Sequence, residues 1–325
     1  MTQILSLAIP SKGRLQEQAQ RYFADAGLVL AQSAGARGYR GTLEGFAEID
    51  VRLMSAGEIV GALLAGDVHL GITGEDLIRE SAPALDGIAL LKALGFGFAD
   101  VVVAVPQAWI DVTAMADLDD VCAAFYQHHR RRLRIATKFV SLTRTFFARA
   151  GIWDYRIVES LGATEGAPAA GAAEAIVDIT TTGATLAANG LKTLKDGTIL
   201  KSQAQLAAGL GAPWTIAARD CAQRFLSRLQ ARERAKSSLV LRVALGQRVD
   251  SILALLAQEP GVKLLSRPAS AQGASAILCP RDCLMHVIAL LRAQGCAETV
   301  TAEDADYVFE PDDPLLSVLS SALPR

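Results

Sequence analysis

The sequence predicts an α/β fold with a largely parallel sheet, followed by a C-terminal unit of ferredoxin-like type. Three observations predict it. Through the first two thirds of the chain, short runs rich in β-branched residues alternate with stretches of helical periodicity. After about Ala222 the order becomes strand, helix, strand, strand, helix, strand, which is the βαββαβ pattern. The composition, 51% hydrophobic and 20% charged, provides enough apolar surface for large cores.

In the first part of the chain each expected strand is a short β-rich run that ends at a glycine, a proline or a polar turn. The strands are expected at Ile4–Ile9, Asp50–Leu53, His69–Ile72, Val101–Val105, Leu133–Ala136, Tyr155–Glu159 and Ile176–Ile179. The helices are expected at Leu15–Ala26, Glu58–Ala65 and Ser141–Ala150. Ligands bind at the carboxyl ends of strands in such sheets, so the loops after Ile9, Ile72, Ala136 and Ile179 are the places to expect a site.

The C-terminal part begins with a charged helix at 225–237. Its βαββαβ pieces are expected at Leu239–Leu245, Val249–Ala257, Val262–Leu265, Ser275–Leu278, Cys283–Ala293 and Thr299–Thr301, with a further strand considered at Tyr307–Phe309. By analogy of fold, a unit of this kind binds a small regulator or a partner subunit.

Length and charge limit the classes of function. With 325 residues the chain has room for two or three domains of roughly 100–200 residues each. A net charge of −2 argues against broad nucleic-acid binding, and the run His128–Arg132 is interpreted as a solvated loop. The basic residues follow the apolar run Ile4–Ile9 instead of preceding it, and no run reaches the ~18 apolar residues of a membrane span. We therefore expect a cytoplasmic protein without nucleic-acid or membrane partners.

The five cysteines are scattered, which is typical of a reducing compartment. Cys279 and Cys283 form the one close pair, and their spacing suits a zinc site poorly.

The segment Ile176–Leu186 has the layout of an anion site. A β-branched run ends in Asp178, and Thr180, Thr181, Thr182, Gly183, Ala184 and Thr185 follow before a helix can start. Backbone N–H groups and the dipole at a helix start favour negative charge, and hydroxyl groups add donors. A sugar phosphate fits this layout, with its phosphate on the turn and its ribose hydroxyls donating to Asp178. The alternative is a plain helix cap made by Thr182 or Thr185.

Residues 165–186, which read EGAPAAGAAEAIVDITTTGATL, resemble the signature of ATP phosphoribosyltransferase, the enzyme that opens histidine biosynthesis. The residues that carry the match are Glu165, Gly171, Ile176, Asp178, Thr182, Gly183, Thr185 and Leu186. Further blocks agree in order, at Ser11–Leu15, Gly71–Asp76 and Arg134–Lys138. The resemblance covers roughly 1–215 strongly and continues weakly to about 310, where the C-terminal unit resembles the regulatory domain of the family's long form.

The resemblance implies two lobes of the periplasmic-binding-protein type (type II), with the site between them, and an ACT-like regulatory domain. On this basis we expect one catalytic lobe at 1–93 and 184–222, a second lobe at 94–183 and the ACT-like domain at 223–325. The family joins ATP to phosphoribosyl pyrophosphate and releases pyrophosphate. It implies Mg²⁺ as cofactor, ATP and phosphoribosyl pyrophosphate as partners, histidine as a possible effector, and a homo-oligomer, expected to be a hexamer. We predict no set of metal ligands from the protein itself.

The resemblance also assigns roles to residues. Arg14, Arg37 and Asp178 are the expected catalytic residues. Glu165, Asp178 and the turn from Thr180 to Thr185 are expected to hold the phosphoribosyl group. Residues Lys12, Arg14, Glu75, Asp76 and Lys138 are expected to bind ATP. For the charged loop residues the alternatives are solvated arginine and, for Glu75 and Asp76, simple capping of the next helix.

The sequence departs from the family in two places. Ser55 stands where many relatives carry an arginine, and Glu58-Ile59-Val60 stands in place of their Asp-Ile-Pro step, so the phosphate contact of that arginine is expected to be lost or supplied elsewhere. The segment 266–270 and the tail 307–325 follow the family's regulatory domain loosely, so histidine inhibition is a hypothesis. Two rival functions stay open at this point: a non-enzymatic small-ligand sensor on the same two-lobe fold, and a phosphoribosyltransferase that uses a different base.

Overall fold

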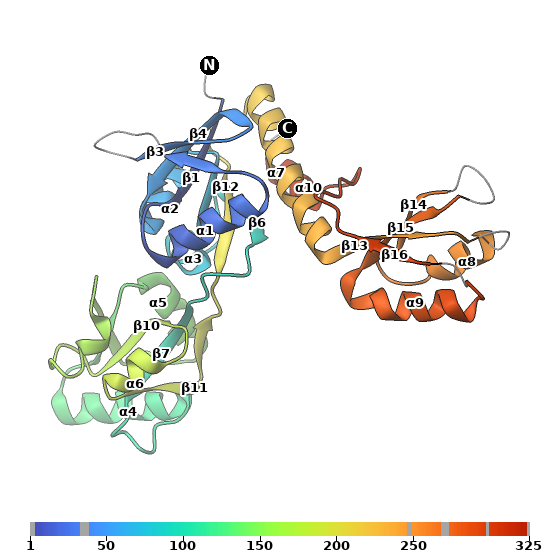
Figure 1. The fold of residues 1–325 in the computed structure, drawn as a ribbon. Coiled ribbons are helices and arrows are strands. Elements are labelled where there is room, and N and C mark those ends of the chain that lie inside the picture. The colour runs from blue at the N-terminus through green and yellow to red at the C-terminus, as the bar shows by residue number, and fades with distance from the viewer. Residues whose placement is uncertain (1–3, 33–38, 246–248, 268–272, 297–298, 324–325) are drawn as a thin grey trace. The chain divides into compact units, whose positions relative to one another are not determined.

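The computed structural model describes residues 4–32, 39–245, 249–267, 273–296 and 299–323 (Figure 1). These residues form two compact units, each described separately below. The first unit comprises residues up to 24, 28–221 and from 318 onward, and the second comprises 25–27 and 222–317. The boundary lies within the long helix α7 (Ile216–Ser237).

The first unit contains two sheets. In sheet order, the strands of the first are β2 (Leu30–Gln32), β3 (Arg40–Leu43), β4 (Phe46–Met54), β1 (Leu5–Pro10), β5 (Leu70–Gly74), β12 (Ala204–Gly209) and β6 (Ile88–Ala93). Those of the second are β11 (Leu191–Leu200), β7 (Asp100–Pro106), β10 (Ala175–Thr180), β8 (Leu133–Thr137) and β9 (Tyr155–Glu159). Strand β1 is buried along its whole length, as expected for the centre of a sheet covered on both faces.

The two sheets share one topology. In the first sheet β1 pairs in parallel with β4 and β5, and β12 runs antiparallel between β5 and β6. In the second sheet β8 pairs in parallel with β9 and β10, and β7 runs antiparallel between β10 and β11. The chain passes between the sheets at 94–99 and again at 201–203. This confirms the expected two-lobe α/β region of the periplasmic-binding-protein type.

The helices begin where polar residues follow the strands. They are α1 (Gly13–Asp25), α2 (Ala56–Ala65) and α3 (Glu75–Ser81) in the first lobe, and α4 (Met115–His129), α5 (Val140–Arg149) and α6 (Ala184–Ala188) in the second. Ser55 caps α2: its Oγ accepts the N–H of Glu58 at 3.4 Å, and the Glu58 carboxylate accepts the N–H of Ser55 at 2.8 Å. This capping box gives the residue found in place of the family's arginine a structural role.

The structure moves one expected boundary. We expected residues from 184 onward to belong to the first lobe, but α6 packs with the second sheet and β11 pairs with β7. The return to the first lobe therefore comes at the connection 201–203. The sequence could not show this, because the pattern of a strand does not say which sheet edge the strand joins.

The second unit contains the expected βαββαβ order. Its elements are β13 (Ser238–Val243), α8 (Val249–Leu256), β14 (Lys263–Ser266), β15 (Ser275–Pro280), α9 (Leu284–Ala293) and β16 (Thr301–Glu303), followed by α10 (Pro314–Ala322). The sheet order β14-β15-β13-β16 is fully antiparallel. Its core includes Leu241, Ile252, Ile277 and Leu291. Residues 307–309, considered as a further strand, are irregular, and residues from 318 onward group with the first unit.

His69, directly before β5, makes buried contacts in the first lobe. Its Nδ1 accepts the N–H of Ser6 at 3.1 Å, and its Nε2 lies 3.2 Å from the carbonyl oxygen of Pro213. The ring meets Trp214 edge to face at 5.0 Å between centroids. Burial lowers the pKa of His69 below its ordinary 6.5. The folded chain therefore favours the neutral imidazole, because a protonated Nδ1 could no longer accept from Ser6.

We expect this histidine to make folding pH-dependent. A lowered folded-state pKa gives stability that is present above pH 6.5 and is lost as the pH falls below it. In urea unfolding at pH 7.5, His69→Gln should lower the free energy of unfolding by about 1–2 kcal/mol. Between pH 7.5 and about 5.5, the free energy of unfolding should fall less in this variant than in the unmodified chain. The exposed His128→Gln is the control. If the free energy of unfolding changed with pH in the same way in the His69 variant and in the unmodified chain, His69 would not be the source of this pH dependence.

Candidate functional site

The turn after β10 is shaped by its own threonines. Thr180 Oγ1 accepts the N–H of Gly183 at 2.8 Å, and Thr182 Oγ1 accepts the N–H of Ala184 at 3.4 Å. Gly183 has φ 76°, which favours glycine, and a Cβ built there would meet no heavy atom within 4 Å. Backbone conformation, not crowding, therefore requires the glycine. Thr181 Oγ1 donates to the carbonyl oxygen of Phe98 at 3.1 Å, which ties the turn to the connection between the lobes.

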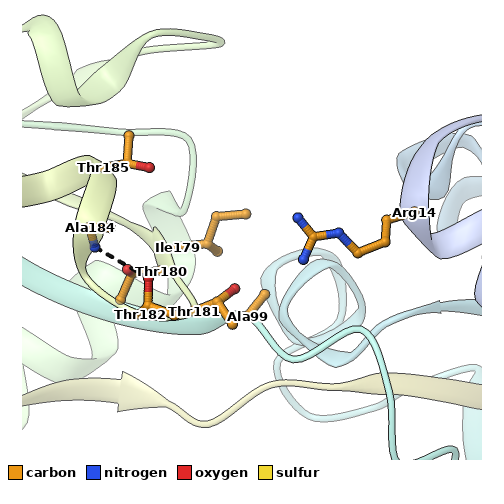
Figure 2. A pocket seen from close by; sticks show the side chains of 8 residues that line it. All are labelled: Arg14, Ala99, Ile179, Thr180, Thr181, Thr182, Ala184 and Thr185. Atoms are coloured by element: carbon orange, nitrogen blue, oxygen red, sulfur yellow. Dashed lines mark hydrogen bonds between the residues drawn. The ribbon is translucent and has the colours of Figure 1, made fainter.

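A cavity of about 330 Å³ faces this turn. Its lining consists of Arg14, Ala99, Ile179, Thr180, Thr181, Thr182, Ala184 and Thr185. Figure 2 shows the guanidinium of Arg14 reaching from its own lobe toward the turn across the open space. Arg14 lies in the first turn of α1, where Gly13 takes φ 75°. The arrangement places an exposed cation opposite a row of hydroxyls, which is suited to a phosphate.

A second cavity, of about 270 Å³, shares Ile179 and Thr185 with the first. Its lining adds Lys138, Leu161, Gly162, Ala163, Thr164, Glu165, Asp178 and Leu186. Burial raises the pKa of Asp178 above its ordinary 3.8. The N–H of Ile179, which donates to Oδ1 at 2.8 Å, and the charge of Lys138 oppose the rise, and Glu165 adds to it. Two carboxylates and one lysine from separate parts of the second lobe thus meet here.

A third cavity, of about 390 Å³, connects these residues to the first lobe. It is lined by Arg14, Leu15, Gln18, Ala56, Gly74, Asp76, Leu77, Gly97, Phe98, Ala99, Lys138, Ile179 and Thr181. Burial raises the pKa of Asp76, and a hydrogen bond from Ser202 and the charge of Lys138 oppose the rise. Ser202 Oγ lies 2.9 Å from Asp76 Oδ1 and accepts the N–H of Asp76 at 3.0 Å. Lys138 therefore interacts electrostatically with an aspartate of each lobe.

The four strand ends singled out from the sequence all contribute. Arg14 follows β1, Asp76 follows β5, Lys138 follows β8 and the threonine turn follows β10. In the first sheet β1 is parallel to β4 and β5, and in the second sheet β10 is parallel to β8. The carboxyl ends of these strands therefore lie on one side of each sheet, so the loops that follow them can share one region.

Of the expected site residues that the structure describes, Lys12, Glu75 and Gly183 line none of these cavities. Glu75 is held by its neighbours: Arg79 Nε donates to it at 2.6 Å and Gln205 Nε2 at 2.8 Å. Lys12 is exposed and lies outside the three linings given above. Arg37 lies outside the described residues. The sequence spacing placed Glu75 and Asp76 together, but adjacent residues on a helix point in different directions.

Several residues of the site were missed from the sequence. Gln18 follows Arg14 by four residues on α1, so helical spacing could have indicated it. Its Oε1 is buried without a hydrogen-bond partner among the described residues. Ser202 and Phe98 lie on the connections between the sheets, where Ala99 N–H donates to the carbonyl oxygen of Ser202 at 3.0 Å. No local sequence pattern marks such residues, because their contacts are long-range.

The second unit has a cavity of its own, of about 490 Å³. Its lining consists of Arg234, Ser237, Ser238, Gly261, Lys263, Leu278, Pro280, Arg281, Asp282 and Glu310. Lys263 Nζ donates to Glu310 at 2.6 Å, and this bond helps to hold the pKa of that carboxyl below its ordinary 4.5. The cavity therefore presents both signs of charge.

Within the described ranges, no three histidine, cysteine, aspartate or glutamate side chains gather as a metal-binding group. In the same part of the chain, no helix combines the length and the apolar character needed to cross a membrane.

Comparison with known proteins gives a consistent result. The HisG family model, described as ATP phosphoribosyltransferase, matches residues 55–231. An ATP phosphoribosyltransferase of Afipia carboxidovorans is 53% identical over 324 residues, which cover 99% of both chains. One of Bradyrhizobium diazoefficiens is 52% identical over 320 residues, or 98% of both. The solved ATP phosphoribosyl transferase (HisG:HisZ) complex from Thermotoga maritima matches with a TM-score of 0.54 and 25% identity, covering 70% of this chain and 98% of that one.

Proposed function

The chain belongs to the ATP phosphoribosyltransferase family, and from this premise we propose which of its residues bind the two substrates and support the transfer. The enzyme transfers the phosphoribosyl group of phosphoribosyl pyrophosphate to N1 of ATP and releases pyrophosphate, in histidine biosynthesis. The alternative of a non-enzymatic sensor is not favoured.

The observation that carries the assignment is the turn from Thr180 to Thr185 facing Arg14 across one cavity. The 5-phosphate of the sugar binds on the turn, where hydroxyls and backbone N–H groups donate to it. Asp178, in the adjoining cavity, accepts hydrogen bonds from the ribose hydroxyls, with Glu165 beside it. Arg14 binds the departing pyrophosphate. ATP occupies the third cavity, next to Asp76 and Lys138.

The chemistry explains why these residue types suffice. Adenine N1 has a free lone pair, so no base must take a proton from it before it attacks the anomeric carbon. No histidine or cysteine lines the three cavities that the described residues form here. The anomeric carbon becomes positively charged while pyrophosphate leaves with its bonding electron pair. Catalysis therefore consists of aligning two anionic substrates and stabilising the leaving group by positive charge.

We propose Mg²⁺ as the metal that accompanies the pyrophosphate. Mg²⁺ is proposed to enter with phosphoribosyl pyrophosphate, bound through the phosphates of that substrate and through waters. When bound, the ion would neutralise charge on the leaving group.

The activity is tested directly with the purified full chain. ATP, phosphoribosyl pyrophosphate, Mg²⁺ and a pyrophosphatase are mixed, and the absorbance of the N1-substituted adenine is followed. Product should form only with both substrates, and omission of Mg²⁺ should abolish it. An unmodified chain that makes no product under these conditions would refute the proposed function.

Histidine is proposed as an effector of the second unit. That unit has the expected ferredoxin-like βαββαβ order, and its cavity offers Arg281 and Lys263 for a carboxylate and Asp282 for an amino group. Excess L-histidine should lower the rate and raise the melting temperature. An unchanged rate together with an unchanged melting temperature would end this proposal.

A homo-oligomer, expected to be a hexamer, and a cytoplasmic location are also proposed. The solved relative from Thermotoga maritima is a complex of two kinds of chain, which supports assembly in general terms. Sedimentation velocity of the purified chain would give the number of subunits, and a monomer would contradict the first proposal. Cell fractionation followed by immunoblotting would test the second.

A further inference from the structure

Helix α5 has no capping side chain of its own. Its N-cap residue is Phe139, and the first N–H groups of the helix are instead bound by Glu80. One oxygen of the Glu80 carboxylate accepts the N–H of Ser141 at 2.8 Å, and the other accepts the N–H of Leu142 at 3.0 Å. A carboxylate at this place satisfies two unpaired donors and meets the positive end of the helix dipole.

This cap links the two lobes. Glu80 lies on α3, which follows β5 of the first sheet, and α5 follows β8 of the second sheet. Leu77, three residues before Glu80 on α3, packs against the apolar clusters of both lobes. Residues at this spacing share a helix face, so α3 offers one apolar and one ionic contact to the second lobe.

Each of the two helices joined by this contact has a charged residue of the site at or next to its N-terminus. Asp76 lies in the first turn of α3, and Lys138 stands two residues before α5 begins. Lys138 acts electrostatically on Asp76 of the first lobe and on Asp178 of the second. Lys138 can interact with both aspartates only if the distance between α3 and the start of α5 is maintained.

We propose that Glu80 is a positioning residue for the transfer. By binding the first turn of α5, it fixes the position of Lys138 relative to Asp76 and Asp178. This inference rests on the proposed function of the same site. Glu80 lines none of the three cavities of the proposed site, and both of its carboxylate oxygens accept backbone N–H groups. Its effect on the reaction passes through the lysine.

The test compares Glu80→Ala with a matched cap that stays within one lobe. Asp117 Oδ2 accepts the N–H groups of Thr113 at 2.7 Å and Ala114 at 2.9 Å at the start of α4. Glu80→Ala should lower kcat/KM for both substrates about 10- to 100-fold, since a displacement of about 1 Å can have that effect. Asp117→Ala should change kcat/KM less than about twofold, although it too loses a helix cap. Glu80→Gln keeps one acceptor oxygen and should fall between Glu80→Ala and the unmodified chain.

A pH profile separates positioning from a plain structural role. The groups that act on Asp178 are the Ile179 N–H, Lys138 and Glu165. Those that act on Asp76 are Ser202, Lys138 and the backbone N–H groups of Asp76 and Leu77. If Lys138 moves away, its opposition to the raised pKa of these aspartates is lost. The acid limb of kcat/KM should then shift to higher pH in Glu80→Ala and stay in place in Asp117→Ala.

The outcomes are distinct. Equal losses of activity in Glu80→Ala and Asp117→Ala, or a rate lowered without movement of the acid limb, would overturn the positioning role while the proposed function stands. If Glu80→Ala does not fold, the folded Glu80→Gln carries the same comparison. An unmodified chain without activity would reject the proposed function and this inference together.

Discussion

Replacing Asp178 by Asn is expected to lower kcat by about 10²- to 10³-fold while the chain remains folded. The carboxylate is proposed to accept hydrogen bonds from the ribose hydroxyls and to stand near the positive charge that develops at the anomeric carbon. An amide keeps the shape and can still accept the N–H of Ile179, but it carries no negative charge. Initial rates in the assay with pyrophosphatase measure the loss directly.

The expected effect on folding has the opposite sign. Burial raises the pKa of Asp178, so the ionised carboxylate is less favourable in the folded chain than in water. Removing that charge should leave the melting temperature at pH 7 unchanged or raise it. Asp120→Asn on the exposed face of α4 is the control, with unchanged rate and unchanged melting temperature. A fully active Asp178→Asn variant would refute the assignment of the phosphoribosyl site.

The pH dependence gives a second test of the same residue. The reaction needs the ionised carboxylate, and its pKa lies above the ordinary 3.8. The rate should therefore fall as the pH drops through that raised pKa. The residual rate of Asp178→Asn should lack this acid limb. If the rate of the Asn variant still fell at acid pH, another group would be responsible for that fall. Asp76 would be the first candidate, because burial raises its pKa too.

Replacing Arg14 by Gln is expected to lower kcat/KM for phosphoribosyl pyrophosphate about 10²-fold. Arg14 lies opposite the threonine turn in the first cavity and is also part of the third, so it faces both proposed substrates. The guanidinium is proposed to pair with the leaving pyrophosphate, whose charge grows during the reaction. Most of the effect should appear in kcat, since the contact strengthens in the transition state. Steady-state kinetics with each substrate varied in turn will separate kcat from KM.

Two further variants sharpen the interpretation of Arg14. Arg14→Lys should recover part of the activity, because it restores the charge but not the planar pair of donors. Arg21→Gln removes an exposed arginine from the same helix and serves as the control. If Arg21→Gln lost as much activity as Arg14→Gln, general electrostatic attraction of the substrates would explain both losses.

Much of the fold could be predicted because its signals are local. The apolar runs that became β1, β7, β8 and β10 end in turns whose residues are visible in the sequence. The βαββαβ order of the second unit was likewise predicted, with element ends that differ by a few residues. Strands β2, β3, β6, β11 and β12 and helices α4 and α10 were missed. Strand β12 was missed because of its composition. Its sequence, AQLAAG, is rich in alanine, which is typical of a helix, yet the segment is a buried strand between β5 and β6.

The sequence by itself determined the turn at the end of β10. Its acid, threonines and glycine are neighbours in the chain, and the hydrogen bonds that Thr180 and Thr182 accept join residues three and two positions apart. The tertiary structure decided which charged residues join that turn. Arg14, Asp76 and Lys138 come from three other strand ends, and Ser202 from a connection between the sheets. Such contacts depend on which strands pair and on how long the chain runs before it returns to its first sheet. Those choices follow from the packing of the whole lobe, because a single strand's hydrophobic pattern is compatible with several neighbours.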